Sequence, residues 1–193
     1  LINALKLRGL KKEEAKVVIT GVGAAGVAAG RLLLAYGVKN ILFCDSKGII
    51  YAERGDDLNK EKKELIAASS AIATKGALAD AVKGAHVFIG LSVPGTLSGP
   101  MVRAMAERPI IFGMSNPSPE IMPEEAKAAG AFIVATGRSD YPNQINNSLV
   151  FPGAFRGMLD SGKKQFSNDI FIKIAQKLAD FVKKPTPDKI IPS

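Results

Sequence analysis

Three glycines, Gly21, Gly23 and Gly26, have the spacing G-x-G-x-x-G between an apolar run and a helical pattern. The first glycine permits a tight strand-to-helix turn, and the second leaves room for a pyrophosphate to approach the backbone. The third lets the helix pack closely against the sheet. The free amides of Ala24, Ala25 and Gly26 and the positive end of the helix dipole would then face the phosphates. The pattern therefore predicts a dinucleotide site.

A second apolar run, 41–44, ends in Asp45 at about the distance at which such sites carry the carboxylate for the adenosine ribose. The alternative is a turn that binds nothing, with Asp45 capping a loop. The negative charge of Asp45 favours NAD, because it would repel the 2′-phosphate of NADP. Lys47 could offset that repulsion, so we expect NAD as the cofactor and keep NADP as an alternative.

The elements that must position these residues alternate along the chain. Apolar runs predict strands over 16–20, 41–44, 86–90, 110–114 and 132–136. Helical patterns cover 24–36, 59–68, 76–83, 98–107, 123–129, 152–162 and 168–183. Buried strands that alternate with helices indicate an α/β fold, here a Rossmann-type, doubly wound, mainly parallel sheet with helices on both faces. The polar stretch 46–63 is expected to be a surface excursion.

Small and polar residues follow every predicted strand, at the carboxyl ends where open α/β sheets bind ligands. Ser92 and Val93 follow the third strand, Asn116 follows the fourth, and the polar segment 136–140 follows the fifth. A cofactor lying across the sheet requires such residues, so Ser92, Val93 and Asn116 join the predicted cofactor site.

Composition indicates one globular domain over 1–193, with 47% hydrophobic and 23% charged residues. No apolar run reaches the roughly 20 residues of a membrane helix, and no signal peptide is recognisable, so we expect a cytoplasmic protein without a membrane partner. The single cysteine, Cys44, cannot form an internal disulfide and is expected to be a packing residue. The single histidine, His86, leaves little room for a histidine metal site.

The net charge of +8 raises the question of nucleic acid. The lysine clusters are mostly mixed with acidic residues, and they lack interleaved aromatics or a known reader motif. We therefore expect a solvated surface and no nucleic-acid partner. A field that attracts anionic ligands is the alternative.

Several motifs together closely resemble the NAD(P)-binding domain of bacterial- and archaeal-type malic enzymes. The match spans nearly the whole chain and is far more specific than the glycine spacing alone. It is carried by the opening segment 1–6, the glycine loop 21–26, and the segments 45–48, 115–117, 135–140, 146–147 and 151–157.

The resemblance implies that Asn116 and Asn147 reach the nicotinamide ribose region and the malate. An amide side chain offers both a donor and an acceptor, which suits orienting a substrate carboxylate without adding charge. Without the resemblance, Asn116 would equally well form a turn before Pro117, and Asn147 would cap the next helix.

The resemblance also implies oxidative decarboxylation of L-malate to pyruvate and carbon dioxide, with Mg or Mn in the complete enzyme. The family's lysine base, tyrosine acid and metal-binding carboxylates match no position here, so we expect no catalytic residue and no metal ligand in this chain. Residues 1–7 are expected to end a linking helix. The chain would then be the C-terminal portion of a two-domain enzyme, inactive alone and lacking an N-terminal catalytic domain. A homodimer or higher homo-oligomer is expected.

Two alternatives stay open from the sequence. One is the cofactor domain of another two-domain dehydrogenase, of the amino-acid or shikimate type, although the loop 138–147 argues against it. The other is a non-catalytic module that senses dinucleotides.

Overall fold

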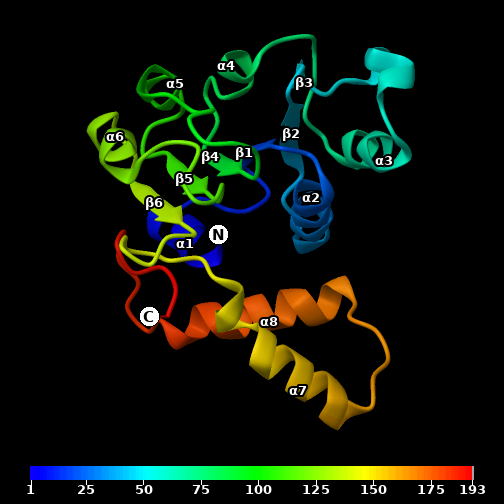
Figure 1. Ribbon diagram of the computed structural model, residues 1–193, viewed down its shortest axis with the longest axis vertical. Coiled ribbons are helices and arrows are strands. Elements are labelled where there is room, and N and C mark those ends of the chain that lie inside the picture. The colour runs from blue at the N-terminus through cyan, green and yellow to red at the C-terminus, as the bar shows by residue number, and fades with distance from the viewer. Residues whose placement is uncertain (193) are drawn as a thin grey trace.

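The computed structural model describes residues 1–192, the side chain of Asp56 excepted, and its centre is a six-stranded sheet in the order β3-β2-β1-β4-β5-β6 (Figure 1). Five strands run parallel: β1 (Lys16–Thr20), β2 (Asn40–Asp45), β4 (Val87–Gly90), β5 (Ile110–Gly113) and β6 (Ile133–Thr136). The short strand β3 (Gly48–Ile49) pairs antiparallel with β2 at one edge. The predicted Rossmann-type, mainly parallel sheet is confirmed.

Helices connect and cover these strands. They are α1 (Ile2–Arg8), α2 (Ala24–Tyr36), α3 (Lys60–Ala68), α4 (Leu78–Ala81), α5 (Gly99–Arg103), α6 (Pro123–Ala128), α7 (Phe151–Ser161) and α8 (Asn168–Phe181), with 3₁₀ helices η1 (Ala52–Asp57) and η2 (Asn147–Leu149). The predicted helix 24–36 is confirmed at both ends.

Two predicted helices are shorter than the sequence suggested. The expected helix 98–107 ends at Arg103, because the amide of Ala106 donates to the carbonyl of Ala85 at 2.9 Å instead of continuing the helical ladder. The expected helix 76–83 covers only Leu78–Ala81 and gives way to a turn at Gly84, whose φ is +66°. The stretch 46–63, expected as a surface excursion, contains β3, η1 and the start of α3.

Two apolar layers enclose the sheet, because successive strand side chains point to opposite faces. Val17 and Ile19 of β1 lie in a buried cluster with Leu5 of α1 and Leu65 of α3. Val18 lies in the cluster of the other face, which also contains Ala81 of α4, Val102 of α5 and Ala126 of α6. Helices on both faces make the sheet doubly wound, as predicted (Figure 1).

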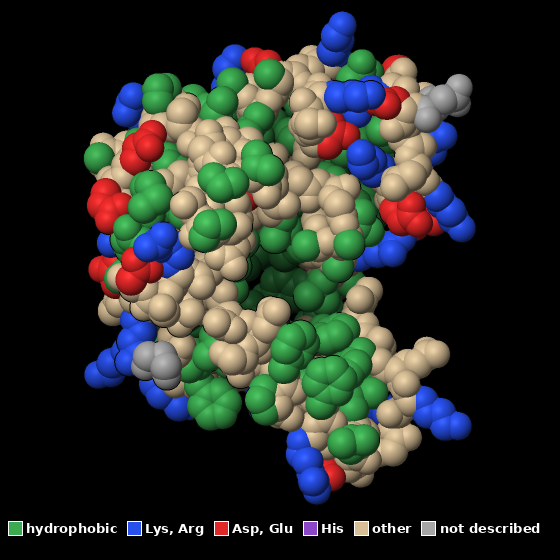
Figure 2. Space-filling view, in the orientation of Figure 1, with side chains coloured by type: hydrophobic (Ala, Val, Ile, Leu, Met, Phe, Trp, Pro, Cys, Tyr) green, Lys and Arg blue, Asp and Glu red, His purple; other side chains and the backbone are tan. Residues whose placement is uncertain are grey.

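The helices α7 and α8 form a hairpin that projects from the sheet layers (Figure 1). α8 contacts α1 and α2, but no residue of α7 or α8 is fully buried. The side chains of Phe155 and Leu159 are 56% and 77% exposed. Figure 2 shows apolar side chains gathered over this hairpin and a hollow between it and the sheet. A groove of about 430 Å³ runs between the two helices.

Candidate functional site

The glycine loop joins β1 to α2 at the carboxyl edge of the sheet. Gly21 has a φ of +86°, and a Cβ atom there would collide with the carbonyl of Leu91. A Cβ on Gly26 would collide with the carbonyl of Gly21, so the helix begins directly against the turn. A Cβ on Gly23 would meet nothing within 4 Å. Two glycines are therefore required by packing within the chain, and the third borders open space.

The beginning of α2 offers unpaired backbone donors beside that open space. The first helical hydrogen bond runs from the amide of Val27 to the carbonyl of Gly23, at 2.9 Å. The amides of Ala24, Ala25 and Gly26 therefore have no acceptor inside the helix, and no side chain caps this end. The arrangement is suited to an anion such as a pyrophosphate.

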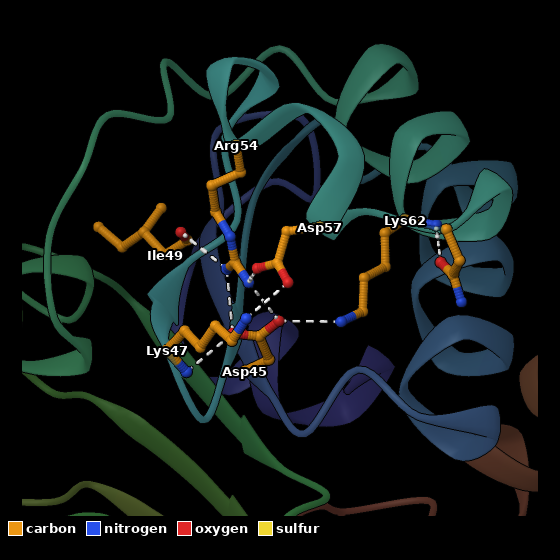
Figure 3. Close-up of polar contacts among 7 residues, drawn as sticks. Asp45, Lys47, Ile49, Arg54, Asp57 and Lys62 are labelled. Atoms are coloured by element: carbon orange, nitrogen blue, oxygen red, sulfur yellow. Dashed lines mark hydrogen bonds and ion pairs between the residues drawn. The ribbon is translucent and has the colours of Figure 1, made fainter.

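Asp45, at the carboxyl end of β2, is the centre of a cluster of charged groups (Figure 3). Nη1 and Nη2 of Arg54 each donate to a different carboxylate oxygen of Asp45, both at 3.0 Å. Nζ of Lys62 donates at 2.9 Å, and the backbone amide of Lys47 donates at 3.0 Å. Burial alone would raise the pKa of Asp45, but these hydrogen bonds offset it and lower the pKa to about 2.

The cations around Asp45 differ from the sequence expectation. The ammonium of Lys47 pairs with Asp57 rather than with Asp45. Arg54, from η1, and Lys62, from α3, instead neutralise the Asp45 carboxylate. Sequence reasoning did not identify either residue, although both lie in the polar, lysine-rich stretch 46–63.

The turn after β4 contains Ser92 and Val93, the other residues assigned to the cofactor. The amide of Ser92 donates to Oε1 of Glu120 at 2.8 Å and is therefore occupied within the chain. The side chain of Val93 is 64% exposed. Glu120, which is fully buried, was not singled out from the sequence.

Asn116 and Asn147 are both exposed beyond the carboxyl ends of neighbouring strands. Asn116 follows β5 by three residues. The segment before Asn147 returns to the end of β6, where the amide of Ile145 donates to the carbonyl of Thr136 at 2.8 Å. Asn146, not Asn147, caps η2, because its side chain accepts from the amide of Ser148 at 2.9 Å. Within residues 1–192, the side chains of Asn116 and Asn147 make no hydrogen bond.

The remaining reactive side chains, Cys44 and His86, are engaged within the chain by burial and by a hydrogen bond, respectively. Cys44 is buried, and burial, together with the neighbouring Asp45, raises the pKa of its thiol to about 12. Nδ1 of His86 accepts a hydrogen bond from the amide of Lys16 at 3.0 Å.

Among the described residues, no group of three or more His, Cys, Asp or Glu side chains could hold a metal ion. None of the described helices combines the length and the apolarity needed to span a bilayer.

The family model described as "Malic enzyme, NAD binding domain" matches residues 1–193. The chain belongs to this family. The malic enzyme resemblance stated from the motifs is thereby confirmed.

The relatives are longer proteins. The chain is 47% identical to the bifunctional malic/malolactic enzyme of Bacillus subtilis, over 100% of this chain and 48% of the relative. It is also 47% identical to an NADP-dependent malic enzyme of Rhizobium meliloti, over 98% of this chain and 25% of the relative. The crystal structure of the NAD-dependent malic enzyme from Thermotoga maritima superposes with a TM-score of 0.90 at 41% identity, covering 100% of this chain and 51% of that one. The chain thus spans about half, or less, of these proteins.

Proposed function

We propose that this chain is the dinucleotide-binding half of an enzyme that oxidises and decarboxylates L-malate to pyruvate and carbon dioxide while it reduces NAD or NADP. One observation carries the proposal most directly. The three unpaired amides at the start of α2 border the open space over Gly23, in a chain that belongs to the malic enzyme family. Bound there, the dinucleotide would accept the hydride removed from malate.

The proposed cofactor is NAD, with NADP accepted as well. The carboxylate of Asp45 lies at the end of β2, where it would bind the adenosine ribose. Its charge is offset by Arg54 and Lys62, so its repulsion of a 2′-phosphate is reduced. Relatives named as NAD-dependent and as NADP-dependent enzymes both occur among the similar proteins, which supports this dual use.

The proposed roles of Asn116 and Asn147 are to orient the nicotinamide ribose and the malate carboxylate. Both side chains are exposed at neighbouring strand ends and are bonded to no described residue, which supports a role toward a ligand. Of the other site residues, Lys47 and Val93 are proposed to line the dinucleotide, and Ser92 to position it from the turn after β4.

The chemistry beyond hydride acceptance is proposed to come from outside these residues. The described side chains do not fit a Mg or Mn site. We propose that an N-terminal catalytic domain supplies the acid, the base and the metal ligands. We also propose assembly as a homodimer or higher homo-oligomer in the cytoplasm.

Two measurements test this function. The 193-residue chain should bind NADH in a fluorescence titration, yet it should reduce no NAD with malate and Mn. In a complete enzyme that carries this domain, Asn147→Ala should impair malate turnover more than dinucleotide binding, whereas Asn146→Ala, which removes only the cap of η2, should impair it less. Turnover by the chain alone would contradict the proposed division of roles, and unchanged malate kinetics in Asn147→Ala would remove that residue from the substrate site.

A further inference from the structure

A buried carboxylate joins two neighbouring strand ends of the proposed site. Glu120 lies between β5 and α6 and is 0% exposed, yet no Lys or Arg among the described residues pairs with it. Its Oε1 accepts the amide of Ser92 at 2.8 Å and the hydroxyl of Ser92 at 3.4 Å. Its Oε2 accepts the amide of Ser115 at 3.0 Å. One side chain thus fixes a backbone peptide after β4 and another after β5.

The end of β4 leaves room for the Glu120 side chain, and the end of β5 leaves room for the loop that carries it. A Cβ on Gly90, the last residue of β4, would collide with the carboxyl group of Glu120. A Cβ on Gly113, the last residue of β5, would lie 3.6 Å from Oε2 and 3.0 Å from Cβ of Pro119. A backbone hydrogen bond also connects the segment after β4 to the Glu120 segment, since the amide of Leu97 donates to the carbonyl of Glu120 at 3.0 Å. The two turns and the Glu120 segment therefore form one packed unit.

Each peptide held by Glu120 adjoins a residue proposed to bind ligand. The Ser92 peptide packs on the glycine loop, because a Cβ on Gly21 would lie 2.7 Å from the Ser92 nitrogen. Ser115 directly precedes Asn116. The carboxylate itself is buried beneath these turns and touches no open surface, so any influence on a ligand passes through the peptides it holds.

We propose that Glu120 is a positioning residue that sets the dinucleotide loop and the Asn116 turn in one fixed arrangement. This inference rests on the proposed function, since it concerns the same site. Both oxygens of the Glu120 carboxyl group act as acceptors, one for the amide of Ser92 and the other for the amide of Ser115. A glutamine of the same shape would turn an NH₂ group toward one of those amides. The peptide at one of the two strand ends would then lose its hydrogen bond to residue 120.

The test is an NADH fluorescence titration of the 193-residue chain and its Glu120→Gln variant, measured well below both melting temperatures. Glu125→Gln is the matched control, because Oε1 of Glu125 also accepts a backbone amide, that of Gly99 at 2.9 Å, but at the start of α5. We expect the Kd for NADH to rise at least tenfold in Glu120→Gln and to stay within about twofold in Glu125→Gln. An unchanged Kd in Glu120→Gln, or equal losses in both variants, would overturn the proposal. Failure of the unsubstituted chain to bind NADH would instead overturn the proposed function, and the proposal with it.

A second pair of variants separates positioning from space filling. Glu120→Ala leaves a void beside Gly90, and adding Gly90→Ala places a methyl group into part of that space. The double variant should unfold at a higher temperature than Glu120→Ala, yet its affinity for NADH should remain as low. Recovery of affinity together with stability would show that Glu120 only fills space, and would overturn the proposal.

Discussion

Substituting the three loop glycines one at a time should separate folding from binding. Gly21→Ala forces a residue with a side chain into a φ of +86° and drives its Cβ into the carbonyl of Leu91. Gly26→Ala drives a Cβ into the carbonyl of Gly21. Gly23→Val places its side chain in open space, at the position where the pyrophosphate is proposed to lie.

The expected magnitudes follow from these contacts. Gly21→Ala combines left-handed backbone strain of about 1–2 kcal/mol with overpacking of about 1–3 kcal/mol, a total of roughly 3 kcal/mol. In a domain of this size that loss should lower the melting temperature by roughly 6–12 °C. Gly23→Val removes only a favourable N-cap residue, a loss of about 1 kcal/mol or roughly 2–4 °C. Blocking two charge-assisted amide contacts to phosphate, at about 1.5 kcal/mol each, should weaken NADH binding about a hundredfold.

The assay is thermal unfolding together with NADH fluorescence titration, on the same preparations. Gly157→Val is the control for the added side chain, because a Cβ at Gly157 also meets nothing within 4 Å, and this residue lies in the middle of α7. That control should bind NADH normally. If Gly23→Val bound NADH with near-normal affinity, the phosphates would not lie over the glycine loop. Unaltered stability in Gly21→Ala would contradict the packing argument.

Three further predictions concern the charged cluster and its neighbour. The pKa of Asp45 is about 2, below its ordinary 3.8, so its contribution to the free energy of unfolding is complete above about pH 4 and is lost as the pH falls toward 2. Asp45→Asn should therefore flatten the acid limb of stability against pH, and an unchanged limb would count against the ion pairs. Lys62→Met should lower the affinity for NADPH about tenfold relative to NADH, because one charge-assisted contact to the 2′-phosphate is lost. A constant ratio of the two Kd values would place the 2′-phosphate elsewhere. Cys44 should resist a thiol reagent at pH 8 until the chain is unfolded in urea, because burial and, to a smaller extent, the charge of Asp45 raise the pKa of its thiol to about 12. Rapid labelling of the native chain would contradict this.

The parts of the fold that local chemistry determines were predictable from the sequence. The five parallel strands were recognisable as apolar runs because both faces of the sheet are covered. The helix 24–36 was predicted to the residue, since glycines at 23 and 37 bracket it and Gly37 adopts a φ of +108°. The short antiparallel strand β3 was missed, because two residues give no periodicity.

The roles of Asn146 and Asn147 illustrate a limit of local reasoning. Either residue of the pair could cap the following 3₁₀ turn, and the two differ by only one position in the chain. The bond between Ile145 and Thr136 sets where the segment leaves β6, so tertiary pairing decides that Asn146 becomes the cap. Asn147 is then left with an unengaged amide, which the sequence alone could not assign.

The carboxylates that organise the site were harder to find, because the residues that they contact lie far away in the sequence. Asp45 was visible because it follows a strand at a recognisable spacing, but its partner Lys62 lies 17 residues further along. Glu120 is 28 residues from Ser92, and no motif connects them. A trace of Glu120 nevertheless exists in the sequence, because both adjacent strands end in glycine, at 90 and 113. Either end would otherwise place a Cβ against the buried carboxylate or its loop. Gly90 thus marks the place where the Glu120 side chain crosses the end of β4, and the two carboxyl oxygens connect the turn that packs on the glycine loop to the turn before Asn116.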